Sequence, residues 1–83
     1  MDLTGRTILV TGASAGIGLA FAERFVALGN TVIITGRSQA KLDAAKAKVP
    51  ELHTIQCDAA DPDAVRELGR RIDEEFPALD VLI

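Results

Sequence analysis

Three glycines lie within seven residues near the start of the chain. They belong to the segment Thr11-Gly12-Ala13-Ser14-Ala15-Gly16-Ile17-Gly18, which separates a short apolar run from a helical pattern. At a strand-to-helix turn, free backbone N–H groups and the positive end of the helix dipole attract a phosphate. We expect Gly12 to permit the tight turn, Gly16 to let the backbone approach a pyrophosphate, and Gly18 to let the helix pack closely on the sheet. The segment therefore predicts a phosphate-binding loop.

The spacing of these glycines narrows the choice of ligand. The pattern is G-x-x-x-G-x-G, whereas the common dinucleotide fingerprint G-x-G-x-x-G, begun at Gly16, would need a glycine where Phe21 stands. No Gly-Lys-Ser/Thr follows, so the loop is not a P-loop and hydrolysis of ATP or GTP is disfavoured. The alternative is a glycine-rich turn that only links a strand to a helix.

The end of the second apolar run offers a cation. In dinucleotide-binding folds an acid at this place favours the ribose 2′-hydroxyl of NAD, whereas an arginine accommodates the 2′-phosphate of NADP. The chain has Thr35-Gly36-Arg37-Ser38 here, without the acid that NAD and S-adenosylmethionine sites use. The guanidinium of Arg37 is a planar, permanently charged donor that suits a phosphate, and Ser14 and Ser38 can add hydroxyl donors. The sequence predicts NADP as cofactor, with NADPH preferred over NADH, unless Arg37 is only a solvated surface residue.

The elements that must position these residues alternate between strand and helix. Apolar runs predict strands over residues 6–11, 31–35, 52–57 and 80–83. Helices are expected from about Ala15 to Leu28, from Ser38 as N-cap to Pro50, and from Asp61 as N-cap to Pro77. The order β-α-β-α-β-α-β, with strand starts 21 to 28 residues apart, predicts a Rossmann-like α/β fold: a parallel sheet with helices on both faces. The third strand, which is less apolar, is expected at the sheet edge, and the chain stops inside the fourth.

Each predicted helix has an apolar stripe that we expect to face the sheet. The three stripes are Ile17, Phe21, Phe25 and Leu28; Leu42, Ala45 and Val49; and Val65, Leu68, Ile72 and Phe76. Charged residues of the last helix, including Arg70 and Glu74, are expected to pair on its solvated face.

Composition excludes several kinds of partner. The 83 residues suffice for one compact domain, and the formal charge of −3 argues against nucleic acid as the main partner. The uncharged stretch from Thr7 to Ala22 is too short and too polar to span a bilayer, and Met1-Asp2-Leu3 lacks the basic region of a signal peptide. A cytoplasmic protein without membrane contact is therefore expected. The lone cysteine, Cys57, cannot form an internal disulfide, and His53 has no neighbouring ligand set, so no metal site is predicted.

Four motifs together resemble the short-chain dehydrogenase/reductase family. They are Thr11-Gly12-(x)3-Gly16-Ile17-Gly18, Thr35-Gly36-Arg37, Cys57-Asp58 and Leu79-Asp80-Val81-Leu82-Ile83, and the resemblance covers the whole chain. It implies that residues 12–18 wrap the cofactor's pyrophosphate and adenosine side, with the Ile17 N–H on a phosphate oxygen and Arg37 on the 2′-phosphate. It also implies that Asp58 accepts a hydrogen bond from the adenine amino group and that the backbone of Ala59 lines the same pocket. For Asp58 the alternative is a carboxylate that caps backbone amides before a helix.

The resemblance further implies an NADP-dependent oxidoreductase that transfers hydride between NADP(H) and a small carbonyl or alcohol substrate and forms a homo-oligomer. The family's catalytic serine and Tyr-x-x-x-Lys have no counterpart here, since the chain contains no tyrosine. Residues 1–83 are therefore expected to be the amino-terminal part of a single dinucleotide-binding domain, without the catalytic residues. Two alternatives stay open: a non-catalytic relative that senses nucleotides, and an interaction fragment that binds none.

Overall fold

In the computed structural model, residues 4–83 are described, and Met1-Asp2-Leu3, on which the signal-peptide expectation rests, lie outside them. The elements in chain order are β1 (Thr7–Val10), α1 (Gly16–Ala27), β2 (Thr31–Gly36), α2 (Gln39–Lys48), β3 (His53–Gln56), α3 (Pro62–Glu75) and β4 (Val81–Leu82). The predicted order of strands and helices is confirmed, and most predicted boundaries lie within one or two residues of the observed ones. Within residues 4–83, no helix is both long enough and apolar enough to cross a membrane.

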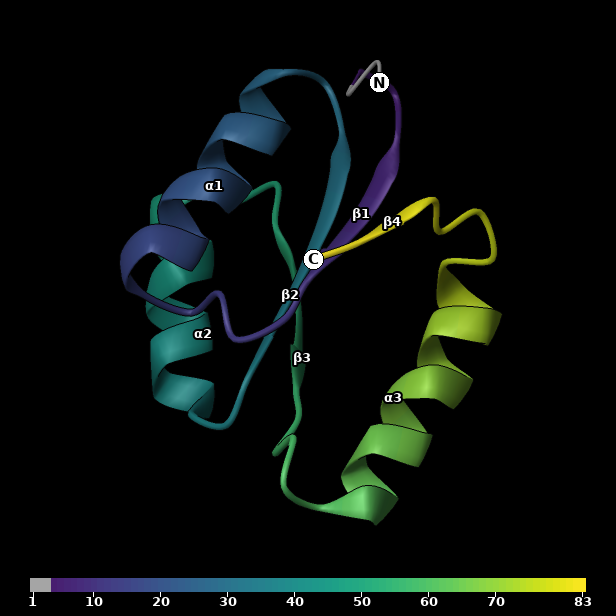
Figure 1. The fold of residues 1–83 in the computed structure, drawn as a ribbon. Helices are drawn as coiled ribbons and strands as arrows, with labels where there is room; N and C mark the ends of the chain where they lie inside the picture. The colour runs from purple at the N-terminus through teal and green to yellow at the C-terminus, as the bar shows by residue number, and fades with distance from the viewer. Residues whose placement is uncertain (1–3) are drawn as a thin grey trace.

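The strands form one parallel sheet in the order β3-β2-β1-β4 (Figure 1). Leu9 pairs with Ile33 of β2 on one side and with Leu82 of β4 on the other. The prediction that β3 lies at the sheet edge is confirmed. Because the strands are parallel, the turns that follow β1, β2 and β3 all meet at one edge of the sheet.

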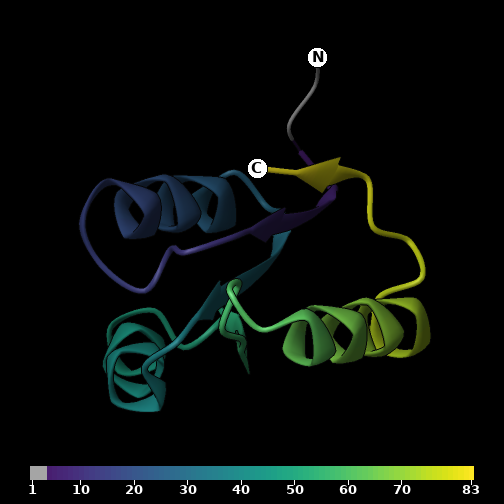
Figure 2. The ribbon, with the colours of Figure 1, turned by 60° about the horizontal axis from the view of Figure 1, so that its bottom comes forward.

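Helices cover both faces of the sheet, as the Rossmann-like pattern predicts. The views in Figures 1 and 2 show α1 and α2 on one side and α3 on the other. Alternate strand residues divide between two cores: Ile8 and Ile34 pack with the α1/α2 side, whereas Leu9 and Ile33 pack with Ile72 of α3. Burial on both faces explains why β1 and β2 are continuous apolar runs.

The predicted stripe of α1 is wrong for three of its four residues. Ile17, Phe21 and Leu28 are exposed, at 77%, 54% and 41%, whereas Ala22 and Phe25 are buried. Apolar residues surround most of this helix, so periodicity does not identify a unique buried face. Gly18 approaches Ala13 in the turn after β1 and Ala22 is buried, whereas Phe21 stacks on Phe25 with ring centroids 6.3 Å apart.

The stripes of α2 and α3 are confirmed apart from one residue. Leu42 and Ala45 of α2 are buried, and Ile72 is the buried centre of α3. Val65, in the first turn of α3, is 45% exposed. It lines a pocket together with the residues that follow β1, β2 and β3.

The N-terminal caps of α2 and α3 were predicted correctly. The Ser38 side chain accepts a hydrogen bond from the Lys41 N–H, and Asp61 accepts one from the Asp63 N–H with Pro62 at the first helical position. Such caps satisfy backbone donors that a helix cannot pair internally. They therefore fix where each strand-end turn stops and its helix begins.

Ion pairs cover the outer face of α3, as expected. Arg70 Nη1 lies 2.8 Å from Glu74 Oε1, and Arg71 Nε donates to Glu75 Oε2 at 2.8 Å. The hydrogen bond from Arg71 lowers the pKa of Glu75. These pairs are solvent-exposed, so they contribute little to the free energy of folding.

A close approach between α1 and the turn after β1 fixes the glycine segment. A Cβ added at Gly18 would lie 3.0 Å from Ala13 Cα and 3.3 Å from Ala13 Cβ. The prediction that Gly18 permits a close approach of the helix is confirmed, but its neighbour is the turn after β1 and not the sheet itself.

We expect Gly18→Ala to lower the free energy of unfolding by about 1–3 kcal/mol, because the new methyl group meets backbone that cannot yield freely. Gly69→Ala is the matched control, since Gly69 is also helical and no atom lies within 4 Å of its added Cβ. That variant should gain about 0.5–1 kcal/mol. Urea denaturation of the intact protein measures both, and equal shifts in the two variants would contradict the close approach.

Candidate functional site

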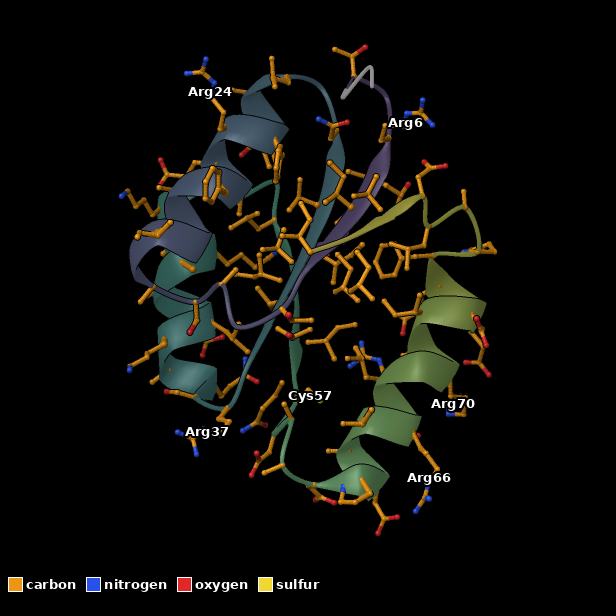
Figure 3. The ribbon with its side chains drawn as sticks, in the orientation of Figure 1. Arg6, Arg24, Arg37, Cys57, Arg66 and Arg70 are labelled. Atoms are coloured by element: carbon orange, nitrogen blue, oxygen red, sulfur yellow. The ribbon has the colours of Figure 1, made fainter. Side chains whose placement is uncertain are left out.

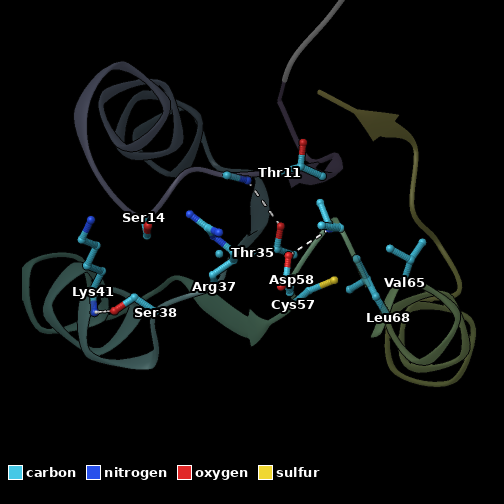
Figure 4. Close-up of a pocket in the computed structure, with 14 residues that line it drawn as sticks. Thr11, Ser14, Thr35, Arg37, Ser38, Lys41, Cys57, Asp58, Val65 and Leu68 are labelled. Atoms are coloured by element: carbon cyan, nitrogen blue, oxygen red, sulfur yellow. Dashed lines mark hydrogen bonds between the residues drawn. The ribbon is translucent and has the colours of Figure 1, made fainter. Parts of the chain in front are cut away.

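A pocket with a volume of about 940 Å³ opens at the carboxyl ends of β1, β2 and β3 (Figure 4). Its lining comes from the turn after β1 (Thr11, Gly12 and Ser14), the end of β2 and the start of α2 (Thr35, Gly36, Arg37, Ser38 and Lys41), the segment after β3 (Cys57, Asp58, Ala59 and Ala60) and α3 (Val65 and Leu68). In parallel α/β sheets, ligands bind at this edge. The pocket is therefore the candidate site.

The glycine turn leads into a helix start that has no side-chain cap. Gly12 and Gly16 both have φ of +66°, and nothing lies within 4 Å of a Cβ added at either residue. Unlike α2 and α3, helix α1 has no side-chain cap at its N-cap residue Ala15, and its first turn carries no acid. No side chain therefore caps its first N–H groups, and an anion at this helix end would suit the helix dipole.

The turn is held to the end of β2 by its own backbone. The Gly12 N–H donates to Thr35 Oγ1 at 3.4 Å, and the Ala13 N–H donates to the Thr35 carbonyl at 3.1 Å. Thr35 is buried, so the acceptor side of this anchor has a fixed position. On the other side of the turn, the Thr11 N–H donates to the Ile83 carbonyl at 2.9 Å.

The structure brings five of the eight predicted site residues to the pocket wall. These are Gly12, Ser14, Arg37, Asp58 and Ala59. Gly16, Ile17 and Gly18 do not line it: Gly16 and Ile17 are exposed at the start of α1, and Gly18 is packed against Ala13. Five predicted site residues therefore form part of the pocket wall, and the other three lie at the start of α1.

Two hydroxyls stand where the turns after β1 and β2 meet. A Cβ added at Gly36 would lie 3.1 Å from Ser14 Oγ, so the Ser14 hydroxyl rests against the β2–α2 turn. Ser38 Oγ accepts from the Lys41 N–H at 3.2 Å, which leaves its hydroxyl proton free to donate. The exposed Arg37 guanidinium extends from the same turn (Figure 4).

The alternative role considered for Asp58 is present in the structure. Asp58 Oδ1 accepts a hydrogen bond from the Ala60 N–H at 2.9 Å, so the carboxylate holds the segment between β3 and α3 in place. The same residue lines the pocket, and Figure 4 shows it between Lys41 on one side and Leu68 on the other. One carboxylate oxygen therefore shapes the loop.

Sequence reasoning missed Lys41, Val65 and Leu68 as pocket residues. Lys41 follows Arg37 by four residues, with Arg37 in the turn before α2 and Lys41 in its first turn, so both cations lie at the same sheet edge. Val65 and Leu68 were assigned to the buried stripe of α3, but they also form an apolar wall of the pocket. Neither feature could be read from the sequence, because a lysine in the first turn of a helix is common and periodicity does not show that Val65 and Leu68 border a pocket.

His53 and Cys57 do not belong to a cluster of metal-ligating side chains within residues 4–83. No group of three or more metal-ligating side chains occurs in the part of the chain that the structure describes. His53 lies edge-on to Phe76, with ring centroids 5.1 Å apart, in a separate hollow beside β3. Cys57 is buried at the end of β3, as expected of a small apolar side chain.

The parallel sheet, with helices on both faces and a glycine turn after β1, defines a Rossmann-like α/β protein. The sequence pattern of the family described as short chain dehydrogenase matches residues 6–83. The chain belongs to this family, whose members are oxidoreductases that use nicotinamide cofactors and act on small molecules.

Individual relatives agree with this assignment. The chain is 49% identical over 83 residues to an uncharacterized oxidoreductase, DltE, of Bacillus subtilis (strain 168), covering 100% of this chain and 33% of that protein. It is 40% identical over 78 residues to a serine 3-dehydrogenase of Agrobacterium fabrum, covering 93% of this chain and 31% of that protein. The chain thus spans about a third of the length of the curated relatives it matches.

Solved structures show the same fold. A 2-keto-3-deoxy-D-gluconate dehydrogenase from Streptococcus agalactiae superposes with a TM-score of 0.86 at 29% identity, over 98% of this chain and 32% of that one. A short chain dehydrogenase from Bacillus anthracis gives a TM-score of 0.83 at 34% identity, over 93% of this chain and 34% of that one.

We expect Asp58→Ala to speed amide hydrogen exchange at Ala60 and to cost about 0.5–1.5 kcal/mol of folding free energy, because that N–H loses its acceptor. Asp58→Asn keeps an acceptor oxygen and should change neither quantity appreciably. Nuclear magnetic resonance exchange rates and urea denaturation measure the two effects. Similar exchange rates in the two variants would contradict the loop-holding role.

Proposed function

We propose that this chain forms the NADP(H)-binding part of a short-chain dehydrogenase/reductase that transfers hydride between NADP(H) and a small carbonyl or alcohol substrate. The observation that carries the proposal is the pocket at the carboxyl edge of the sheet, where the glycine turn, Arg37 and Asp58 lie together. The open space above Gly12 and Gly16 and the uncapped start of α1 fit a pyrophosphate. NADP, when bound, supplies or accepts the hydride.

Each part of the pocket has a proposed share in binding. The N–H groups of residues 16–18 and the turn at Gly12 hold the pyrophosphate, with the Ile17 N–H on one oxygen. Arg37, helped by Ser14 and Ser38, binds the 2′-phosphate of the adenosine ribose. The free Asp58 oxygen accepts from the adenine amino group, while Ala59 and the apolar Val65 and Leu68 flank the adenine.

The cofactor preference follows from charge. The turn after β2 presents the exposed Arg37 and no carboxylate, so a 2′-phosphate finds a donor there while a 2′-hydroxyl finds no acid. NADPH is therefore the preferred form. We further propose that the intact protein is a cytoplasmic homo-oligomer.

Residues 1–83 contain no tyrosine and therefore do not include the family's Tyr-x-x-x-Lys motif. A second candidate function is therefore a protein that binds the nucleotide and senses it without catalysis. Oxidation of NADPH by the intact protein in the presence of a panel of aldehydes and ketones favours the enzyme. Saturable NADPH binding with no turnover of any panel member favours the sensor.

We expect Arg37→Gln to weaken NADPH binding by about tenfold or more, since a charge-assisted hydrogen bond contributes about 1.5–3 kcal/mol. NADH binding should stay within about twofold, because it lacks the phosphate that Arg37 contacts. Calorimetric titration of the intact protein with each cofactor measures both constants. Arg24→Gln, which changes a cation at the opposite end of the molecule (Figure 3), is the control.

The reversed charge sharpens this test. Arg37→Asp should favour NADH over NADPH, because the carboxylate repels the 2′-phosphate and can accept from the 2′-hydroxyl. An unchanged ratio of the two dissociation constants in both Arg37 variants would overturn the cofactor preference, while leaving nucleotide binding itself intact.

A further inference from the structure

Most positive side chains in this acidic chain already have partners. Arg6, Lys48, Arg66, Arg70 and Arg71 form ion pairs with carboxylates, and the Lys46 ammonium donates to the carbonyl oxygens of Pro50 and Leu52. Within residues 4–83, the cations with neither a carboxylate partner nor a carbonyl acceptor are Arg24, Arg37 and Lys41.

Two of these three unpaired cations line the same pocket. Arg37 comes from the turn after β2 and Lys41 from the first turn of α2, and both side chains are exposed to solvent. Figure 4 shows them on the side of the pocket that Ser14 and Ser38 also line. The third, Arg24, lies in the last turn of α1, at the far end of the molecule (Figure 3).

The acid of the pocket does not neutralise this pair. Asp58 is the one carboxylate among the described lining residues, and its Oδ1 is engaged by the Ala60 N–H. It follows β3, lies away from Lys41 toward the middle of the pocket (Figure 4), and forms no ion pair with Arg37 or Lys41. The pocket is thus cationic on the side of α2 and anionic on the side of β3.

Two cations beside two hydroxyls match a phosphate monoester, whose charge near neutral pH is about −1.5 to −2. Arg37 supplies a planar fork with fixed donor geometry, whereas Lys41 supplies a compact point charge on a flexible stem. A single guanidinium would leave part of the phosphate charge without a counterion.

We propose that Lys41 is a second specificity-determining residue, which binds the 2′-phosphate of NADP(H) together with Arg37 and thereby adds to the preference for NADPH. This rests on the proposed function and extends it to a residue outside the glycine, Arg37 and Asp58 motifs. The Lys41 ammonium acts on the phosphate from the side of α2, and Ser14 and Ser38 donate their hydroxyl protons to the same group.

The test is Lys41→Met in the intact protein, titrated with NADPH, NADH, adenosine 2′,5′-bisphosphate and adenosine 5′-phosphate. Methionine keeps the length and the helix-forming tendency of lysine, so α2 should persist. We expect the two ligands that carry the 2′-phosphate to bind about fivefold to tenfold more weakly, and the two that lack it to bind within about twofold of the original protein.

Matched variants separate charge from structure. Lys41→Arg should restore binding of the 2′-phosphate ligands, and Arg24→Met, which removes the unpaired cation outside the pocket, should leave all four constants unchanged. The loss of NADPH affinity in Lys41→Met should also shrink as salt is raised, because ions screen the exposed charge.

The outcomes distinguish this proposal from the proposed function. Unchanged binding of 2′-phosphate ligands in Lys41→Met, alongside a loss in Arg37→Gln, overturns the role of Lys41 and leaves the NADP site intact. Equal weakening of all four ligands makes Lys41 merely structural. Failure of the unaltered protein to bind either cofactor saturably overturns the proposed function, and the role of Lys41 with it.

Discussion

The contact of Ala13 with both Thr35 and Gly18 is the constraint on which the rest of the site depends. The Ala13 N–H is bonded to the Thr35 carbonyl, and a Cβ at Gly18 would lie only 3.0 Å from Ala13 Cα. The turn after β1, the start of α1 and the end of β2 are thereby locked into one body. Because parallel pairing brings β3 to the same edge, the segment holding Asp58 has a fixed position relative to that body. Local hydrogen bonds thus convert the sheet edge into a site with defined walls.

Much of the fold could be predicted because its signals are local and redundant. β-branched runs mark strands buried on both faces, and Ser38 and Asp61 mark helix starts through caps that the structure shows. The buried face of α1 could not be predicted, since apolar residues surround the helix and the decisive contact is made by Gly18, which has no side chain. Hydrophobic periodicity measures side chains, so it is insensitive to a backbone contact.

The parts of the candidate site that could be predicted are those in motifs directly after a strand. The glycine turn and Arg37 could be placed because both follow strands whose ends must meet. Lys41 was not predicted as a pocket residue, because a lysine in the first turn of a helix is common. Its distinguishing property, the lack of a carboxylate partner, becomes visible only when every other charge has been placed.

Unpaired cations near one another are informative because they carry an electrostatic cost. Like charges at one pocket repel, and a chain with twelve acids and nine basic residues has carboxylates to spare for pairing. On α3 all three arginines are indeed paired with carboxylates. At the end of β2 there is instead no carboxylate, and Asp58, which follows β3, is engaged by the Ala60 N–H and pairs with neither cation. An anion that enters between Arg37 and Lys41 relieves their repulsion, so the arrangement favours a ligand with phosphate on one side and a hydrogen-bond donor on the other.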